Sequence, residues 1–114
     1  MSNIVYKIVS KVNWSNFIKS GIKECKGFDN DLTDGFIHLS THDQLYSTFI
    51  KKYNNENKNK YNLLAVDLEQ SEDVKWEKAK NGNIYPHLYS PLILDKNIIW
   101  VHDLENYQFN ANGI

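Results

Sequence analysis

Runs of hydrophobic and β-branched residues mark four predicted β-strands along the chain. These runs cover residues 4–9, 61–68, 74–78 and 98–104. The run at residues 61–68 is almost continuously apolar, which is typical of a strand buried on both faces. We also expect residues 4–9 to form a central strand, in which side-chain alternation places Lys7 on the same face as Val5 and Val9.

Two stretches have apolar residues at helical spacing. In the first, Asn13 can cap a short helix that contains Trp14, Phe17 and Ile18 and ends at Gly21. The second helix should run from residue 42 to about residue 53. Its apolar stripe consists of Leu45, Tyr46, Phe49, Ile50 and Tyr53. The polar segments at residues 22–33 and 54–60 are predicted to be loops, and the lysines near the second one, Lys51 and Lys52 among them, to be solvated.

Residues 34–41 (DGFIHLST) combine a turn, a short strand and the start of a helix. The Asp-Gly pair is a turn signal. Alternation then places Phe36, His38 and Ser40 on one face of the strand and two aliphatic residues on the other. Thr41 opens a capping-box pattern. An imidazole, hydroxyls and unpaired backbone N–H groups therefore lie close together, which favours a small-ligand site.

The segment at residues 84–94 contains both prolines of the chain and follows an Asn-Gly-Asn turn. Because proline cannot donate to a ladder of backbone hydrogen bonds, we predict that Pro86–Pro91 lines a cleft rather than the centre of a sheet. In an extended conformation three of its side chains share one face: Tyr85, His87 and Tyr89.

These elements predict a single α+β domain over residues 1–114, with its core at about residues 3–104 and a polar tail at 105–114. The expected architecture is a mixed or antiparallel, split β-sheet with two short helices. A content of 41% hydrophobic residues suffices for a core without metal or disulfide support. Cys25 is the only cysteine, so we interpret it as a structural residue in a reducing compartment.

The charge of the chain argues against some classes of binding partner. The formal net charge is −1, which gives no electrostatic basis for binding nucleic acid or an anionic membrane. All the basic residues are lysines, so bidentate arginine recognition of phosphate is excluded. The sequence has no signal-peptide pattern and no apolar run of membrane-spanning length, and we expect a cytosolic protein.

Histidines carry most of the candidate chemistry. His38 and His42 have a zinc-like spacing, but the predicted helix cap between them separates them, and we predict no dedicated metal site. His38 and His87 form the better pair, because aromatic and hydroxyl-bearing residues flank both. We predict that they face a common solvent-accessible cavity together with at least one of Tyr85 and Tyr89.

Two residues have alternative interpretations. Glu77 follows a tryptophan, so it is either partly buried with a perturbed pKa or paired with Lys75 or Lys78 at the surface. If His38 faces a ligand, replacing it by alanine should cost under about 1 kcal/mol of stability. If it ties buried backbone groups, the cost should be about 1–3 kcal/mol.

The chain resembles the bacterial domain-of-unknown-function family 952 over nearly its whole length. The resemblance rests mainly on residues 34–41 and on Pro86-His-Leu-Tyr-Ser-Pro-Leu, with support from 4–8, 63–67 and 75–77. That family is similar to the ADP-ribosyltransferase fold group, small split α+β domains that bind NAD. By position, the resemblance implies that Lys7, His38 and either Glu77 or His87 occupy the site. The family typically has a histidine where this chain has Lys7.

Two functions from different classes follow from the resemblance and the residues together. The first is an NAD-binding domain of the ADP-ribosyltransferase type, possessing His38, Glu77 and His87 as catalytic residues. In it Lys7, Ser40, Thr41, Tyr85 and Tyr89 would bind the ligand, with tyrosine rings stacked on nicotinamide and pyrophosphate at the helix start near Thr41. The second is a non-enzymatic module that binds a nucleotide-like metabolite or a partner protein. Lys7 and the missing arginines predict NAD binding weaker than about 1 µM.

Overall fold

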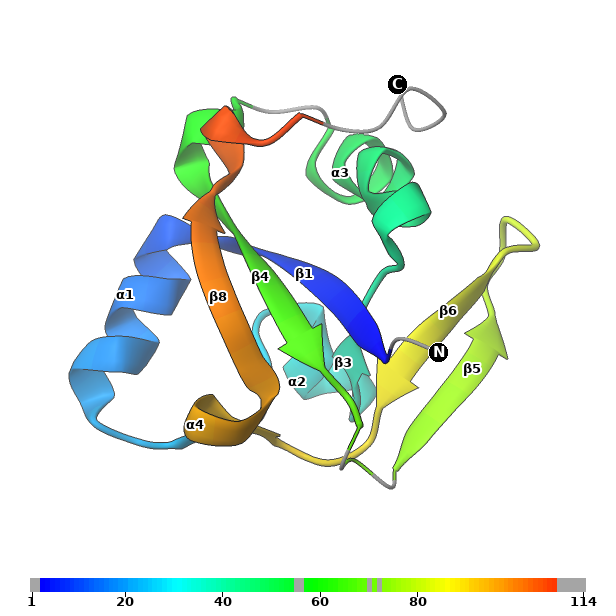
Figure 1. The fold of residues 1–114 in the computed structure, drawn as a ribbon. Coiled ribbons are helices and arrows are strands. Elements are labelled where there is room, and N and C mark those ends of the chain that lie inside the picture. The colour runs from blue at the N-terminus through cyan, green and yellow to red at the C-terminus, as the bar shows by residue number, and fades with distance from the viewer. Residues whose placement is uncertain (1–2, 55–56, 70, 72, 109–114) are drawn as a thin grey trace.

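The computed structural model describes residues 3–54, 57–69, 71 and 73–108, which form an α+β domain with antiparallel sheets (Figure 1). The first sheet has the order β1-β4-β8, with β1 at Ile4–Ser10, β4 at Tyr61–Asp67 and β8 at Ile98–Asp103. All four predicted strands are present within one or two residues of their expected ends. The strand at Val74–Lys78, β5, belongs to a different sheet.

The second three-stranded sheet has the order β3-β6-β5, with β3 at Ile37–His38 and β6 at Ile84–Leu88. A further pair joins β2 (Glu24–Cys25) to β7 (Leu92–Ile93). Past β3 the chain leaves the second sheet and pairs with β1. There Tyr6 N donates to Ser40 O over 2.8 Å, and Ser40 N donates to Tyr6 O over 2.9 Å. This bridge joins the two sheets at the edge of β1.

The prediction of β1 as a central strand was wrong. The middle strand of the first sheet is β4, which is paired on both sides and carries the fully buried Leu63 and Leu64. On its second side β1 has one bridge, to Ser40. Before that bridge the chain pairs with β6 at Ile37 and His38, and after it a helical turn starts at His42, so the pairing with β1 stops at Ser40.

The prediction that the proline segment avoids the sheet centre was also wrong, because β6 is the middle strand of its sheet. Pro86 is buried and lies opposite Leu39, whose N–H donates to Pro86 O over 3.1 Å. In an antiparallel pair of this type the second bond would come from the N–H that proline lacks. The ladder between β3 and β6 therefore ends there, which leaves Ser40 able to pair with β1.

The helices differ from the predicted pair at their ends and in number. Helix α1 spans Lys11–Ser20 and ends at Gly21 as predicted, but its N-cap is Ser10, whose hydroxyl accepts from Asn13 N. The predicted cap at Asn13 was wrong because Ser10, at the end of β1, already satisfies that amide. The second predicted helix is present as a 3-10 turn, η1 (His42–Gln44), with the expected capping box, followed by α3 (Leu45–Tyr53).

Further short elements were not predicted. The expected loop at residues 22–33 contains β2 and the start of helix α2 (Asn30–Asp34), which ends at Gly35 with φ 81°. Helix α4 (Leu94–Asn97) precedes β8, and two more 3-10 turns are η2 (Lys58–Lys60) and η3 (Leu104–Asn106). These elements have five residues or fewer, too short for a periodic pattern to reveal them.

The core lies on both faces of the first sheet. Val5 and Val9 of β1 belong to a cluster that also contains Cys25, with Trp14 and Phe17 of α1 packed against it. Ile8 belongs to a second cluster with Leu45 and Phe49 of α3. The alternation predicted for β1 is therefore confirmed, as is the structural role of Cys25. Among the described residues, no helix has the length and apolar character needed to cross a membrane.

Candidate functional site

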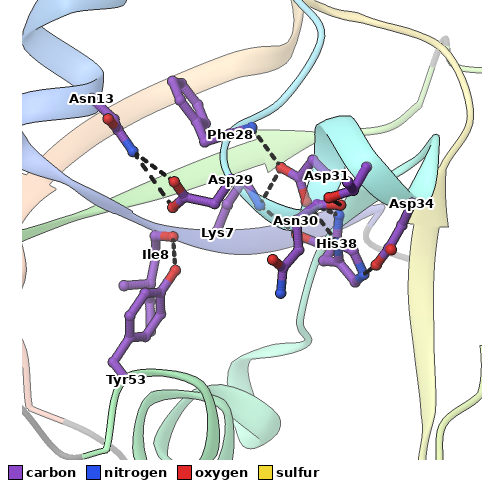
Figure 2. Close-up of polar contacts among 11 residues, drawn as sticks. Lys7, Ile8, Asn13, Phe28, Asp29, Asn30, Asp31, Asp34, His38 and Tyr53 are labelled. Atoms are coloured by element: carbon purple, nitrogen blue, oxygen red, sulfur yellow. Dashed lines mark hydrogen bonds and ion pairs between the residues drawn. The ribbon is translucent and has the colours of Figure 1, made fainter.

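The site is built around a lysine in the core. Alternation along β1 places Lys7 on the face of Val5 and Val9, and its side chain is only 4% exposed. A buried ammonium group needs a charged partner and hydrogen-bond acceptors. Its Nζ lies 2.9 Å from Asp31 Oδ2 and donates to the carbonyl oxygen of His38 over 2.9 Å (Figure 2). The ammonium group predicted to bind a ligand is thus held largely by the protein itself.

Asp31 of α2 gathers four donors on one buried carboxylate. Its Oδ1 accepts from the backbone N–H of His38 (3.0 Å) and faces His38 Nδ1 (2.7 Å). Its Oδ2 accepts from Phe28 N (2.9 Å) and pairs with Lys7. Gly27 makes room for this arrangement, because a Cβ at that position would lie 2.4 Å from Asp31 Cβ, and its φ of +110° also favours glycine.

Electrostatics keeps this carboxylate ionised. Burial alone would raise the pKa of Asp31, but the hydrogen bond from His38 and the charge and hydrogen bond of Lys7 outweigh it. Together they hold the pKa of Asp31 well below its usual value. Burial lowers the pKa of Lys7, and the charge of Lys52 lowers it further, while Asp31 acts in the opposite direction. The ionised carboxylate is therefore the fixed charge around which Lys7 and His38 are arranged.

His38 lies between two carboxylates from α2. Its Nδ1 meets Asp31 Oδ1, and its Nε2 lies 3.1 Å from Asp34 Oδ2 (Figure 2). A doubly protonated imidazole can donate to both oxygens at once. The ring is 30% exposed, whereas Asp31 is fully buried. His38 therefore connects a buried charge to the surface of the site.

His87 lies directly opposite His38 in the β3–β6 pair, with ring centroids 5.5 Å apart. Its Nδ1 lies 2.8 Å from Glu77 Oε1, and the hydroxyl of Tyr89 donates to the same oxygen over 2.6 Å. Phe36 stacks on the His87 ring at 4.3 Å. When Nδ1–H donates to Glu77, Nε2 is left as an acceptor, the arrangement that a general base requires.

Of the two alternatives foreseen for Glu77, the structure shows the first, a partly buried side chain with a perturbed pKa. The side chain is 39% exposed, and its partners are His87 and Tyr89 rather than a lysine. The hydrogen bond from Tyr89, and to a smaller extent that from His87, lowers the pKa of Glu77. The Tyr89–Glu77 hydrogen bond also raises the pKa of Tyr89. Strand register places Glu77 opposite Tyr85, on the histidine-bearing face of the sheet.

His38, His87 and Tyr85 line one cavity of about 260 Å³, between β1, the second sheet and α3. The predicted cavity shared by the two histidines and a tyrosine is thus present. Tyr6 and Tyr53 add aromatic surface, and the cavity also reaches Lys7, Lys51 and Lys52. Within the described residues every acidic side chain lies outside this lining, so its charged groups are all cationic.

The remaining predicted site residues divide into two groups. Ser40 lines the cavity but is buried, with its hydroxyl 2.9 Å from that of Thr48. Thr41, Glu77 and Tyr89 lie outside the cavity lining. Thr41 serves the capping box, so the helix start expected to hold pyrophosphate is not part of this cavity. Tyr89 borders a separate hollow of about 300 Å³ beside Phe36 and Pro91.

Sequence reasoning missed Asp31, Lys51 and Lys52. A signal for Asp31 existed, since a lysine on the buried face of β1 requires a carboxylate, but the sequence did not distinguish Asp31 from its acidic neighbours. Lys51 and Lys52 were interpreted as solvated. Their position depends on where the last turn of α3 lies against β1, which no local pattern reports.

The family model described as a protein of unknown function, DUF952, matches residues 8–101. The chain belongs to the DUF952 family. It is also similar to the crystal structure of protein CC0527 from Caulobacter crescentus, with 34% identity, a TM-score of 0.76 and coverage of 97% of this chain and 91% of that one. The solution NMR structure of CC0527 gives a TM-score of 0.72, at 34% identity and 97% and 90% coverage. No curated protein matches the sequence significantly.

The low pKa of Asp31 predicts how acid acts on the fold. A carboxyl whose pKa is depressed by folding contributes stability above its unfolded pKa of about 3.9, and this contribution is lost as the pH falls toward the folded value. A carbon-detected NMR titration should show the Asp31 carboxyl still ionised at a pH of about 3.5, with stability falling below a pH of about 4. A protonation midpoint at or above about 3.9 would contradict this prediction.

Proposed function

We propose that the protein binds a phosphorylated nucleoside of the NAD class in the cavity between β1, β6 and α3. The observation that carries this proposal is the composition of the cavity wall, which combines two opposed histidines, tyrosine rings and charged groups of one sign. Aromatic faces suit a nicotinamide or adenine ring, and cations suit phosphate. The resemblance to the ADP-ribosyltransferase fold group supports the same ligand class.

In this proposal His87 recognises the sugar. The Glu77 carboxylate fixes the ring so that Nδ1 donates, which leaves Nε2 to accept a hydrogen bond from a ribose hydroxyl. Tyr85 of β6 lies opposite Glu77 of β5 and lines the cavity, and its ring stacks on the base. His38 is held in place by Asp31 and Asp34, and its ring forms the part of the cavity wall next to His87.

The Glu77–His87 pair favours ribosyl transfer as a second candidate function. In that step the bond between ribose C1′ and the nicotinamide nitrogen breaks, and nicotinamide leaves with the electron pair. An acceptor hydroxyl oxygen bonds to C1′, and its proton passes to His87 Nε2. Glu77 then stabilises the imidazolium ion that forms. Because Glu77 lies outside the cavity lining, its role in this step is exerted through His87 rather than by contact with the ribose.

Isothermal titration with NAD, ADP-ribose, AMP and nicotinamide mononucleotide tests the proposal. We expect at least one of them to bind. The dissociation constant of NAD should lie above about 1 µM, because the site has no arginine. His87→Ala should weaken that binding at least about tenfold, through loss of the acceptor. His102→Ala is the control, because His102 stacks on Trp100 in β8, outside the cavity.

Chromatographic assay of nicotinamide in the NAD samples separates the two functions. Release that depends on His87 would establish transfer or hydrolysis, whereas binding without release would leave the binding function alone. Absence of binding by all four ligands, or equal effects of His87→Ala and His102→Ala, would contradict the proposal.

A further inference from the structure

The last turn of α3 carries two lysines, Lys51 and Lys52, that both line the cavity. Two contacts fix this helix against the site. The hydroxyl of Tyr53 donates to Ile8 O over 3.0 Å (Figure 2), and Thr48 Oγ1 lies 2.9 Å from Ser40 Oγ. The lysine pair is therefore held on the opposite wall from β6 by packed elements rather than by a loop.

The charges of this lining are unevenly compensated. Lys7 is neutralised by Asp31, and His38 faces two carboxylates. Lys51 and Lys52 have no carboxylate within ion-pair distance among the residues that the structure describes, and Lys52 lies 5.9 Å from the centre of the Tyr53 ring. The charge of Lys52 also reaches the buried Lys7 and lowers its pKa. Excess positive charge thus concentrates at the α3 end of the cavity.

Resting on the function proposed above, we propose that Lys51 and Lys52 form a phosphate subsite, and that the cavity encloses one nucleoside monophosphate-sized group. A phosphate monoester carries a charge of about −1.5 to −2 near neutral pH, which matches two ammonium groups. These groups also offset the partial negative charge at the carboxyl end of α3, which would otherwise repel an anion. Lysine binds phosphate as a point charge, so the missing arginines do not exclude this subsite.

The cavity volume sets the size of the enclosed ligand. At about 260 Å³ it lies near the lower limit of small-molecule pockets, which are roughly 300–1,000 Å³. One nucleoside with its phosphate suits this space, with the sugar toward His87 and the phosphate toward α3. In a dinucleotide such as NAD, the second nucleoside would extend outside. We therefore expect nicotinamide mononucleotide or AMP to bind about as tightly as NAD.

The subsite is tested by removing the phosphate from the ligand and, separately, the two lysine charges from the protein, and by measuring affinity in each combination. Calorimetry compares nicotinamide mononucleotide with nicotinamide riboside, and AMP with adenosine, on the unmodified chain and on a Lys51→Gln, Lys52→Gln variant. On the unmodified chain the phosphate should improve affinity at least about tenfold, and more at low salt. In the double variant this advantage should disappear while nucleoside binding is retained.

A Lys19→Gln, Lys96→Gln variant is the matched control, because it removes the same charge from exposed positions outside the cavity. This control should keep the phosphate advantage. Nucleosides that bind as tightly as their monophosphates would overturn the subsite but leave the proposed function standing. A higher affinity for monophosphates that persists in the Lys51→Gln, Lys52→Gln variant would also overturn the subsite and leave the proposed function standing. If neither nucleosides nor nucleotides bind the unmodified chain, the proposed function fails, and the subsite with it.

Discussion

Replacing Asp31 by asparagine should lower the free energy of unfolding by about 3–5 kcal/mol, a large share of the stability of a small domain. The substitution leaves the ammonium group of Lys7 buried without an anion, and it replaces an acceptor of the His38 ring by an amide. Guanidinium unfolding, monitored by tryptophan fluorescence, measures the effect. If the variant does not fold, the addition of Lys7→Met should restore part of the stability by removing the unpaired charge.

Asp29→Asn is the control for this prediction. Asp29 lies two residues earlier and is exposed, and its carboxylate receives long hydrogen bonds of 3.3 and 3.5 Å from the Asn13 side chain. Its φ is 53°, and asparagine is enriched at positive φ to the same degree as aspartate, so the substitution adds no backbone strain of its own. We expect a loss under about 1 kcal/mol. Equal losses for the two variants would show that the buried carboxylate does not organise the site.

His38→Ala should cost about 1–3 kcal/mol of stability and also remove ligand binding. The structure favours the larger of the two costs considered from the sequence, because the His38 ring bonds a fully buried carboxylate. The backbone N–H of His38 would still donate to Asp31, so the cost should remain below that of Asp31→Asn. Binding should be lost because His38 forms part of the cavity wall and supports His87.

Measuring the guanidinium midpoint and the affinity for nicotinamide mononucleotide on the same preparation separates the two effects. His102→Ala again serves as the control and should leave the affinity unchanged. A large loss of stability with unchanged affinity would identify His38 as a packed histidine and remove it from the binding site.

The sequence by itself determined the features that depend on near neighbours. Strand alternation placed Lys7 on the same face as Val5 and Val9. It also placed His38 on the face of its strand away from the buried aliphatic residues. The capping box that begins at Thr41 was equally legible, because all its contacts lie within four residues. These features arise from backbone geometry with a period of a few residues, which an isolated stretch of chain already specifies.

Only the tertiary structure decided which residues complete the site. The partner of Lys7 lies 24 positions away in a helix of five residues, and the partner of His87 lies on a neighbouring strand. Pro86 could enter the sheet centre because the chain turns toward β1 at the position where its missing N–H would have donated. Lys51 and Lys52 reach the cavity because Tyr53 fixes their helix against β1. Each of these outcomes depends on how whole elements pack, and periodicity along the chain carries no information about that packing.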